Sequence, residues 1–240
     1  VHYQAHVNLC TSVPMVKSAR ALGIRRVRLW PKAVDTDLFR PERRTKAMRE
    51  RLTDGNPEAP LMTYVGRLSF EKRLDWLLGP VTQLPGVRLA LVGSGPAEAE
   101  LKRRFKGTNT VFTGYMGGLE LAAAYASSDV FAFPSDTETL GFVAMEAMAS
   151  GVPAVGARAG GIPDVIQDGE NGFLFTPGDL GDLTQKLRTL LFDPATRKRM
   201  GARARADMQR FGWQAATEAM VDFYDLAIKV RHRFDPPSVY

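Results

Sequence analysis

The sequence predicts an α/β fold: a doubly wound parallel sheet of six strands, with helices on both faces and at the C-terminal end. Six short runs are almost continuously apolar, which is typical of strands that are covered on both faces. Helical stretches separate these runs, and this alternation is typical of parallel strands joined by right-handed crossovers. Ligands of such sheets bind beyond the carboxyl ends of the strands, so we expect function in the strand-to-helix turns.

The expected elements follow one another from Leu61 onward. The strands are expected at residues 61–68, 87–93, 109–114, 130–135, 152–157 and 173–176. Helices are expected in DWLLGPVTQL, AEAELKRRF, GLELAAAYASS, TLGFVAMEAMAS and DLTQKLRTLLF, with a short turn, GIPDVIQDG, after the fifth strand. Two further helices are expected after Pro194, in RKRMGARARADMQRF and WQAATEAMVDFYDLAIKVRHRF. The first 35 residues hold one apolar run, VNLCTSVP, and one helical stretch, MVKSARALGI.

Length and composition exclude several classes of protein. The 240 residues are 45% hydrophobic and 24% charged, which excludes a disordered chain, a collagen or a coiled coil. No apolar run approaches the roughly 18 to 20 residues of a membrane-spanning helix, so any membrane contact is expected to be peripheral. The single cysteine, Cys10, excludes an internal disulfide and favours a reducing compartment. Three histidines speak against a histidine-rich metal centre.

The net charge of +6 has a definite location. Between Lys186 and Arg233 there are eleven Lys and Arg against five Asp and Glu, so this segment holds the whole excess. No nucleic-acid motif or aromatic platform accompanies it, so nucleic acid is not expected as a partner. A solvated basic helix face is the ordinary interpretation, and an anionic membrane surface is the alternative.

Two early turns carry candidate binding residues. After the first strand, Gly66 allows close backbone approach, and Arg67 and Lys72 can converge on one polyanion. Solvated loop charges are the plain alternative for these two cations. After the second strand, Gly93 opens a Gly-Ser-Gly-Pro turn. This turn is either a phosphate or sugar cradle or a short tight turn.

The turn after the fourth strand is the most informative. Glu146 lies in an otherwise apolar helix, so its carboxylate needs a hydrogen-bond donor. Glu138 lies at the mouth of that helix. Between the two glutamates, the free N–H groups of Thr139, Leu140 and Gly141 offer an anion site. A capping Glu and a structural buried Glu are the alternative, but a ligand with hydroxyls at both ends and phosphates between them, such as a nucleotide sugar, fits better.

These segments carry a family resemblance. The pattern Glu-x7-Glu inside PSDTETLGFVAMEAMASGVPAV, with VGRLSFEK, VGSGP, VFTGYM and ARAGGIPDVIQDGENGFLF in this order, resembles the donor-binding domain of family 4 retaining glycosyltransferases. Those enzymes have the GT-B fold of two Rossmann-like domains. The resemblance covers roughly residues 60 to 215, and its five matching turns make it specific.

The resemblance implies roles for the candidate residues. Arg67 and Lys72 would hold the donor diphosphate, and Glu138 would contact the donor sugar, which makes these three the expected catalytic residues. Glu146 would contact the ribose hydroxyls. The remaining binding residues would be Gly66 and Gly93, the backbone at Gly114 and Tyr115 for the base, and Thr139 with the amides of Leu140 and Gly141 for the phosphates. No metal and no cofactor is expected, because the UDP-sugar is a substrate and the cations stabilise its departing phosphate.

Further segments are similar to a subfamily. RLWPKAVDTDLFRP and MRERLTDGNPEAPLMTYVGRLSFEK are similar to the sulfoquinovosyltransferases of plants, algae and cyanobacteria, which transfer sulfoquinovose from its UDP conjugate to diacylglycerol. This similarity implies a peripheral protein of the chloroplast envelope or, in a bacterium, of the cytoplasmic membrane face. A nucleotide-binding fragment without turnover and a mannosyl- or sucrose-type family 4 transferase are the alternatives.

The resemblance also implies a division of the chain. Residues 1–35 would be the end of an N-terminal acceptor domain with its linker, 36–215 the donor-binding domain, and 216–240 a C-terminal helix and tail. Because the chain opens on Val1 rather than Met, we expect a fragment of a longer protein.

Overall fold

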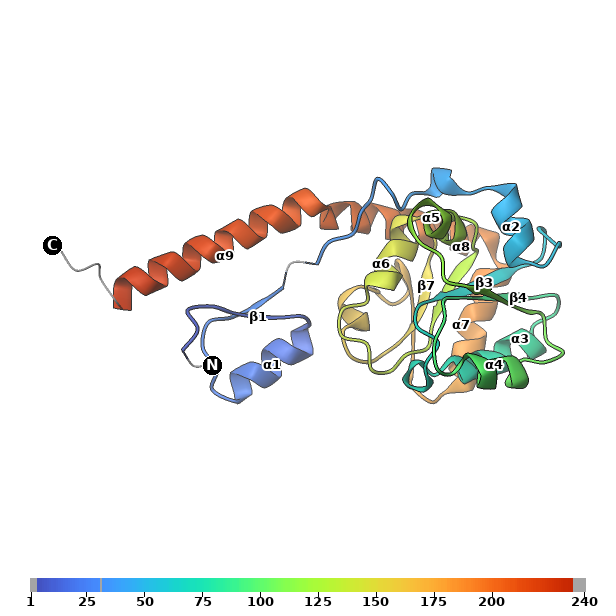
Figure 1. The fold of residues 1–240 in the computed structure, drawn as a ribbon, viewed down its shortest axis with the longest axis horizontal. Helices are drawn as coiled ribbons and strands as arrows, with labels where there is room; N and C mark the ends of the chain where they lie inside the picture. Colours follow the sequence, from blue (N-terminus) through green and yellow to red (C-terminus); the bar gives the residue numbers. More distant parts are fainter. Residues whose placement is uncertain (1–3, 31, 235–240) are drawn as a thin grey trace.

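The computed structural model describes residues 4–30 and 32–234 (Figure 1). Six parallel strands form its main sheet in the spatial order β5-β4-β3-β6-β7-β8. They are β3 (Leu61–Val65), β4 (Arg88–Val92), β5 (Thr110–Gly114), β6 (Val130–Phe133), β7 (Ala154–Ala157) and β8 (Gly172–Phe175). Each strand falls within or beside a predicted apolar run, which confirms the doubly wound parallel sheet.

The sheet reverses its direction of growth between β3 and β6. The chain builds β3, β4 and β5 outward on one side and then returns to place β6 beside β3, with Met62 opposite Val130. The turns that leave β3 and β6 therefore start side by side at the carboxyl edge and run to opposite halves of the sheet. A crevice for a ligand is expected at such a reversal.

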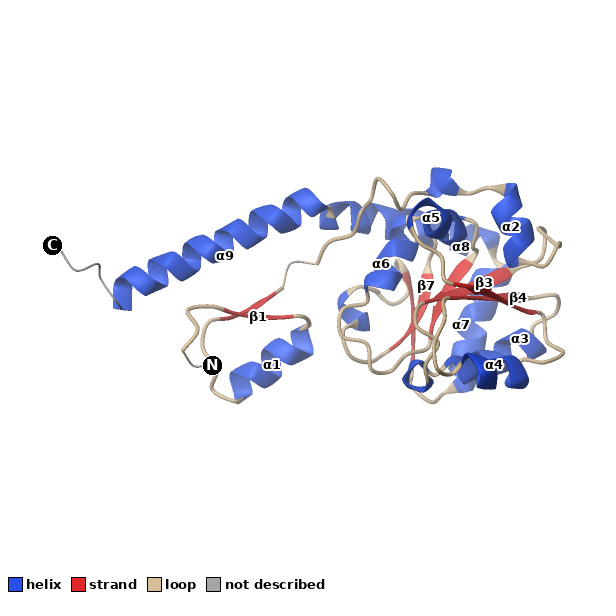
Figure 2. Ribbon diagram, in the orientation of Figure 1, coloured by secondary structure: helices blue, strands red, loops and turns tan. Residues whose placement is uncertain are grey.

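Helices cover both faces of this sheet (Figure 2). On one face lie α3 (Leu78–Gln83), α4 (Glu98–Arg104) and α7 (Leu180–Phe192). On the other face lie α2 (Lys46–Leu52), α5 (Gly118–Ala126), α6 (Phe142–Ala149) and α8 (Pro194–Met208). Buried Leu183, Leu187 and Leu190 show the helical spacing that holds α7 to the sheet.

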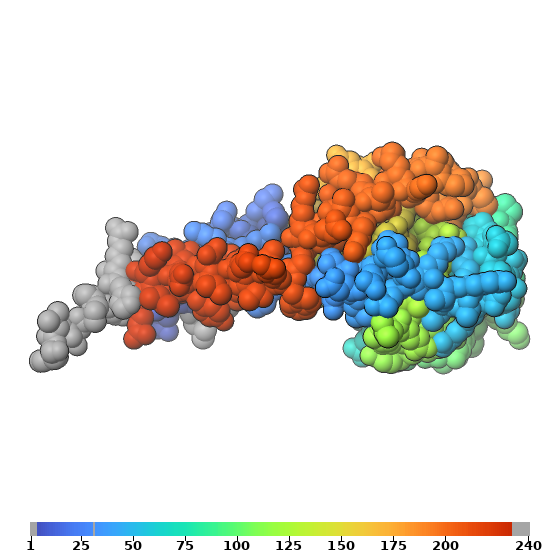
Figure 3. Space-filling view, turned by 90° about the horizontal axis from the view of Figure 1, so that it is seen from above, coloured from blue at the N-terminus to red at the C-terminus, as the bar shows by residue number. Residues whose placement is uncertain are grey.

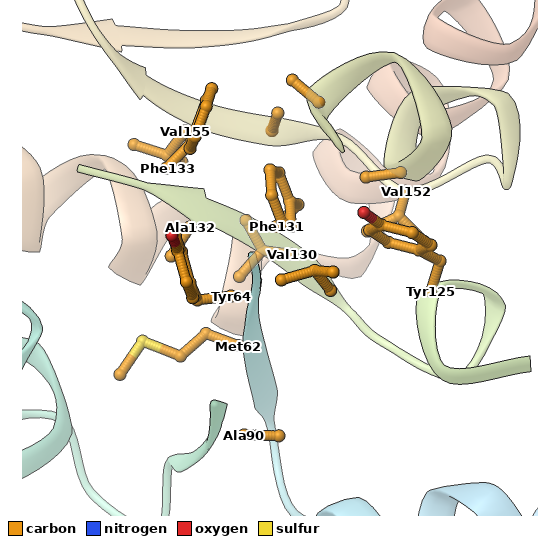
Figure 4. Close-up of a cluster of buried hydrophobic side chains, with 14 of the residues drawn as sticks. Met62, Tyr64, Ala90, Tyr125, Val130, Phe131, Ala132, Phe133, Val152 and Val155 are labelled. Carbon is orange, nitrogen blue, oxygen red and sulfur yellow. The ribbon is translucent and has the colours of Figure 1, made fainter. Parts of the chain in front are cut away.

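Aromatic side chains fill the core between the sheet and α5 (Figure 4). Tyr125 meets the ring of Phe131 edge-on at 5.8 Å and that of Phe39 at 5.7 Å between centroids. All five residues of β3 are buried, as expected for a central strand, whereas the edge strand β5 is half-buried along its length. The apolar runs thus reflect burial on both faces.

Two helical regions differ from the sequence prediction. The helix expected in DWLLGPVTQL is shorter, because Leu74–Leu77 form a 3₁₀ turn and the α-helix α3 starts only at Leu78. Helix α2 was not expected; the side chain of Thr45 caps it by accepting a hydrogen bond from the N–H of Met48 at 3.1 Å.

The N-terminal segment forms a small unit of its own. Strand β1 (Asn8–Cys10) pairs in parallel with β2 (Val27–Leu29), and α1 (Val13–Ala21) connects them. This unit lies beside α9 (Trp213–Phe234), which projects from the rounded main body (Figure 3). No helix in residues 4–30 and 32–234 has the length and apolarity needed to cross a membrane. The domain boundaries after residues 35 and 215 stay predictions.

Candidate functional site

The turns after β3 and β4 are joined through their backbones. The N–H of Gly66 donates to the carbonyl of Val92 at 3.0 Å, and the N–H of Leu68 donates to that of Ser94 at 3.0 Å. A Cβ atom on Gly93 would lie 2.0 Å from the carbonyl oxygen of Gly66, and one on Gly95 would lie 2.3 Å from that of Leu68. The glycines of the second turn are therefore required for the close packing of the two turns.

The N–H of Gly93 is already used within the protein. It donates to the carbonyl of Gly114 at the end of β5, at 2.8 Å. Of the two sequence interpretations of this turn, the tight turn accounts for Gly93, because its amide points at protein rather than at an anion site. The same contact places Gly114 next to the first two turns.

A pocket of about 420 Å³ opens beside these turns. The predicted residues that line it are Gly66, Arg67, Gly93, Tyr115 and Glu146. The lining residues that sequence reasoning missed are Val65, Val92, Ser94, Met116, Leu121 and Val143. Tyr115 is 81% exposed, so its ring borders the pocket from the solvent side. The pocket thus combines apolar walls with one cation and one carboxylate.

Glu146 lies on the second turn of α6, and its carboxylate is largely buried. Burial raises the pKa of this carboxyl, and a hydrogen bond from the Tyr125 hydroxyl, at 2.8 Å to Oε2, offsets part of that rise. This donor is the partner that the apolar helix required. No sequence pattern indicated this role for Tyr125, because a tyrosine in an alanine-rich helix is expected to lie in the core.

Glu138 and Lys72 form an ion pair at the carboxyl ends of β6 and β3. The Lys72 Nζ donates to Glu138 Oε2 at 2.9 Å, and both side chains are about four-fifths buried. Burial raises the pKa of Glu138, but Lys72 and the backbone N–H groups of Leu140 and Gly141 outweigh burial and hold that pKa below its ordinary value. The amides that were expected to meet phosphate therefore bind the protein's own carboxylate here.

A glycine pair fixes the loop that carries Glu138. The N–H of Gly161 donates to the carbonyl of Glu138 at 2.8 Å. A Cβ atom on Gly160 would lie 2.0 Å from that carbonyl oxygen, and one on Gly161 would lie 2.1 Å from the carbonyl oxygen of Thr139. This Gly-Gly pair lies within the motif ARAGGIPDVIQDGENGFLF, and its role in holding the loop was not predicted from the sequence.

The predicted residues thus fall into two adjoining groups. One is the pocket with Glu146; the other is the Lys72–Glu138 pair with Thr139, Leu140 and Gly141. The turn after β3 joins them, because it supplies Arg67 to the pocket and Lys72 to the pair. The arrangement can bind a ligand with a flat apolar end, vicinal hydroxyls and an anionic middle.

The chain resembles known proteins over this region. A family model described as glycosyl transferases group 1 matches residues 59–193. A sulfoquinovosyl transferase of Arabidopsis thaliana is 47% identical over 223 residues, which cover 90% of this chain and 44% of that protein. A GDP-mannose-dependent alpha-mannosyltransferase of Corynebacterium glutamicum is 32% identical over 97% of this chain and 55% of its own length. The chain thus spans about half the length of these curated relatives.

Solved structures share its fold. A sucrose-phosphate synthase from Thermosynechococcus elongatus superposes with a TM-score of 0.81 at 27% identity, covering 95% of this chain and 60% of that one. The Anabaena protein HepE, in complex with UDP, gives 0.83 at 24% identity over 92% of this chain and 64% of its own. These likenesses confirm the predicted fold, the C-terminal half of a GT-B structure. With the family match over more than half of its residues, the chain belongs to the group 1 glycosyl transferases.

Proposed function

We propose that the chain binds a UDP-sugar at the carboxyl edge of β3, β4 and β6, as the donor-binding part of a retaining glycosyltransferase. The observation that carries this proposal is the turn after β3. It supplies one cation, Arg67, to a pocket that holds a buried carboxylate, and a second cation, Lys72, to the neighbouring ion pair. A nucleoside diphosphate carries ribose hydroxyls, which a carboxylate can bind, next to two phosphates, which the two cations can bind.

Each part of the donor then has a partner. Tyr125 bonds to one oxygen of Glu146, so the other oxygen is assigned to the ribose hydroxyls. Gly114 and Tyr115 border the place of the base. Arg67 and Lys72 bind the diphosphate, together with the amides of Leu140 and Gly141 once Glu138 turns away. Glu138 then contacts the sugar.

The chemistry that these residues supply is electrostatic. When UDP leaves the sugar, negative charge builds on the phosphate next to the broken bond. Fixed cations and backbone N–H groups aimed at that phosphate stabilise the transition state. Arg67 and Lys72 therefore serve as catalytic residues without a metal ion, and retention follows from attack on the face that UDP leaves. No cofactor takes part.

For the transferred sugar we propose sulfoquinovose, and for the acceptor diacylglycerol. The 47% identity to the Arabidopsis sulfoquinovosyl transferase supports this choice over the mannosyl type, where the identity is 32%. Since the chain spans less than half of the Arabidopsis protein, UDP binding without turnover is the alternative for residues 1–240 alone.

A lipid acceptor requires a membrane surface, which we propose is the chloroplast envelope in a plant or alga and the cytoplasmic membrane face in a bacterium. The fold uses four cations of the basic segment internally, namely Lys186, Arg197, Arg203 and Arg205. Six others are exposed: Arg188, Lys198, Arg199, Arg210, Lys229 and Arg231. Each exposed cation contributes about 1 kcal/mol at an anionic leaflet. We expect binding to anionic vesicles that falls steeply with salt, and binding to neutral vesicles that equals it would contradict this placement.

Calorimetry and an activity assay on the same preparation test the proposed function. Residues 1–240 are titrated with UDP, GDP and uridine and then assayed for transfer to diacylglycerol. We expect UDP to bind more tightly than GDP or uridine, with no change on adding EDTA. Binding without transfer would support the alternative above. Preference for GDP would indicate the mannosyl type, and a strict divalent-ion requirement would contradict the metal-free chemistry.

A further inference from the structure

Lys32 is a buried cation that the donor site described above does not use. It lies in the segment that connects β2 to the main body, and only 7% of its surface is exposed. Its Nζ makes no hydrogen bond to any described residue, and Asp164 Oδ2 lies 3.8 Å away. Burying an ammonium group without hydrogen-bond partners is costly, so this position calls for an explanation.

The carboxylates around Lys32 do not satisfy it. Asp164 Oδ2 already accepts a hydrogen bond from the N–H of Val13 at 3.0 Å. Glu138, the other carboxylate whose charge acts on Lys32, is bound by Lys72 and by two backbone N–H groups. Burial lowers the pKa of Lys32 more than Asp164 and Glu138 raise it. Because neither carboxylate accepts a hydrogen bond from Lys32, its ammonium group is available to bind another anion.

The loop that carries Glu138 also holds unsatisfied polar atoms. Ser135 Oγ and Asp136 Oδ1 are buried and make no hydrogen bond to any described residue. They precede Glu138 by three and two residues. Buried polar atoms are normally paired, so their presence beside Glu138 indicates that a polar ligand completes this end of the site.

We propose that Lys32 recognises the donor sugar by forming an ion pair with an anionic substituent, a sulfonate or a carboxylate. This inference rests on the proposed function, in which Glu138 contacts the sugar. Geometry brings Lys32 to that sugar: its paired carboxylate, Asp164, lies three residues after Gly161, whose N–H donates to the carbonyl of Glu138 at 2.8 Å. Lys32 thus becomes a specificity-determining residue. A neutral sugar provides no anionic group for its ammonium, so the site favours donors that carry an acidic group.

A second cation at the carboxyl end of a strand, Arg158, is engaged elsewhere. Arg158, just after β7, forms an ion pair with Asp168 and donates to the carbonyl of Leu174. Its side chain is half exposed and already paired, as is usual for a surface arginine with a structural role. The contrast assigns the anionic substituent to Lys32 and makes Arg158 a suitable comparison in the experiment.

The experiment compares donors across variants of residues 1–240 by calorimetry. The donors are UDP, UDP-glucose, UDP-glucuronate and UDP-sulfoquinovose. The variants are Lys32→Met, which keeps the length without the charge, and Lys32→Arg, which keeps the charge. Arg158→Met tests the other cation, and Lys46→Met, at an exposed lysine, is the matched control. Denaturation of Lys32→Met checks folding, and we expect little loss of stability because the buried ammonium group makes no hydrogen bond to any described residue and lies 3.8 Å from its paired carboxylate, Asp164.

We expect wild type to bind an acidic donor about tenfold or more tightly than UDP-glucose, as a charged hydrogen bond provides. Lys32→Met should abolish this preference while its affinities for UDP and UDP-glucose stay within about twofold, and Lys32→Arg should keep part of it. Preference for the sulfonated or the carboxylated donor identifies the substituent, and either supports the proposal.

Other outcomes overturn the inference. An equal loss of UDP-glucose and acidic donors in Lys32→Met would show that Lys32 only holds the linker against Asp164. A preference abolished by Arg158→Met instead would assign the anion to Arg158, and wild type without any preference would exclude such a site. If wild type fails to bind UDP itself, the proposed function fails, which is a separate result from loss of sugar preference.

Discussion

The paired turns after β3 and β4 and the loop between β6 and α6 lie at the same edge of the sheet. Both have close backbone contacts, but the loop adds an ion pair to them. The paired turns are joined by backbone hydrogen bonds and by glycines that leave no room for a side chain. The loop has the same kind of contact at Gly160 and Gly161, and its Glu138 carboxylate is in addition bound by Lys72 and by the backbone N–H groups of Leu140 and Gly141. In the proposed donor site, the nucleoside end would therefore be preformed, whereas the phosphate end is occupied by a carboxylate that an incoming anion would have to displace.

The largest effect is expected from filling the space between the paired turns. Gly93→Ala puts a Cβ atom where the carbonyl oxygen of Gly66 is 2.0 Å away, so we expect a loss of about 2 to 3 kcal/mol in the free energy of unfolding. Gly55→Ala is the matched control, since Gly55 also has a positive φ but no atom lies within 4 Å of its Cβ position. Its expected loss is about 1 kcal/mol. Equal losses in urea denaturation would show that close packing does not hold the turns together.

Removing Lys72, the cation that the turn after β3 extends to the loop, tests which end of the ligand it binds. Lys72→Ala should weaken UDP by about 1.5 to 3 kcal/mol, because a charged hydrogen-bond partner of the diphosphate is lost. Uridine, which has no phosphate, should bind to the variant as it does to wild type. Equal weakening of both ligands in calorimetry would place Lys72 outside the diphosphate site.

Removing the carboxylate that competes with phosphate for Lys72 should have the opposite effect, which is tighter binding of an anion. Glu138→Gln frees Lys72 and the backbone N–H groups of Leu140 and Gly141 from a carboxylate. Because such a partly exposed ion pair is worth about 0 to 1 kcal/mol, we expect pyrophosphate to bind up to about fivefold more tightly. Weaker pyrophosphate binding in this variant would refute the displacement step.

The smallest effect concerns the stability cost of Glu146. Burial raises its pKa above the ordinary value of 4.5, so the folded state holds a proton more tightly than the unfolded state. The resulting loss of folding stability is absent below the ordinary value of 4.5, where the carboxyl is protonated in both states, and grows as the pH rises toward the raised pKa. Glu146→Gln should therefore unfold at a higher denaturant concentration than wild type at neutral pH. The two proteins should converge at about pH 4, where both side chains are neutral, and a difference independent of pH would contradict this explanation.

Much of the architecture could be predicted, because burial on both faces leaves a visible apolar signature in each strand. The short strand at 27–29 and helix α2 were missed, since three strand residues or seven helix residues carry too little periodicity. The 3₁₀ turn before α3 was missed because local apolarity does not distinguish it from the first turn of an α-helix.

The sequence predicted several of the residues that line the pocket, but few of the contacts that these residues make. Arg67 was predicted from its place in the turn after the first strand, Glu146 from its charge in an apolar helix and Tyr115 from the family resemblance, and the structure brings them to one pocket. The role of Gly93 in packing, the hydroxyl that supports Glu146 and the buried Lys32 depend on chain segments far apart in sequence. Such contacts leave no local pattern, so only the folded structure reveals them.

In the proposed function, two carboxylates divide one donor between them. Calorimetry with UDP and with a complete UDP-sugar on Glu146→Ala and Glu138→Ala tests this most directly. We predict that Glu146→Ala loses about 1.5 to 3 kcal/mol with both ligands, whereas Glu138→Ala binds UDP at least as well as wild type and loses affinity only for the complete donor. If both variants bind UDP and the UDP-sugar as wild type does, the assignment of the two carboxylates is wrong.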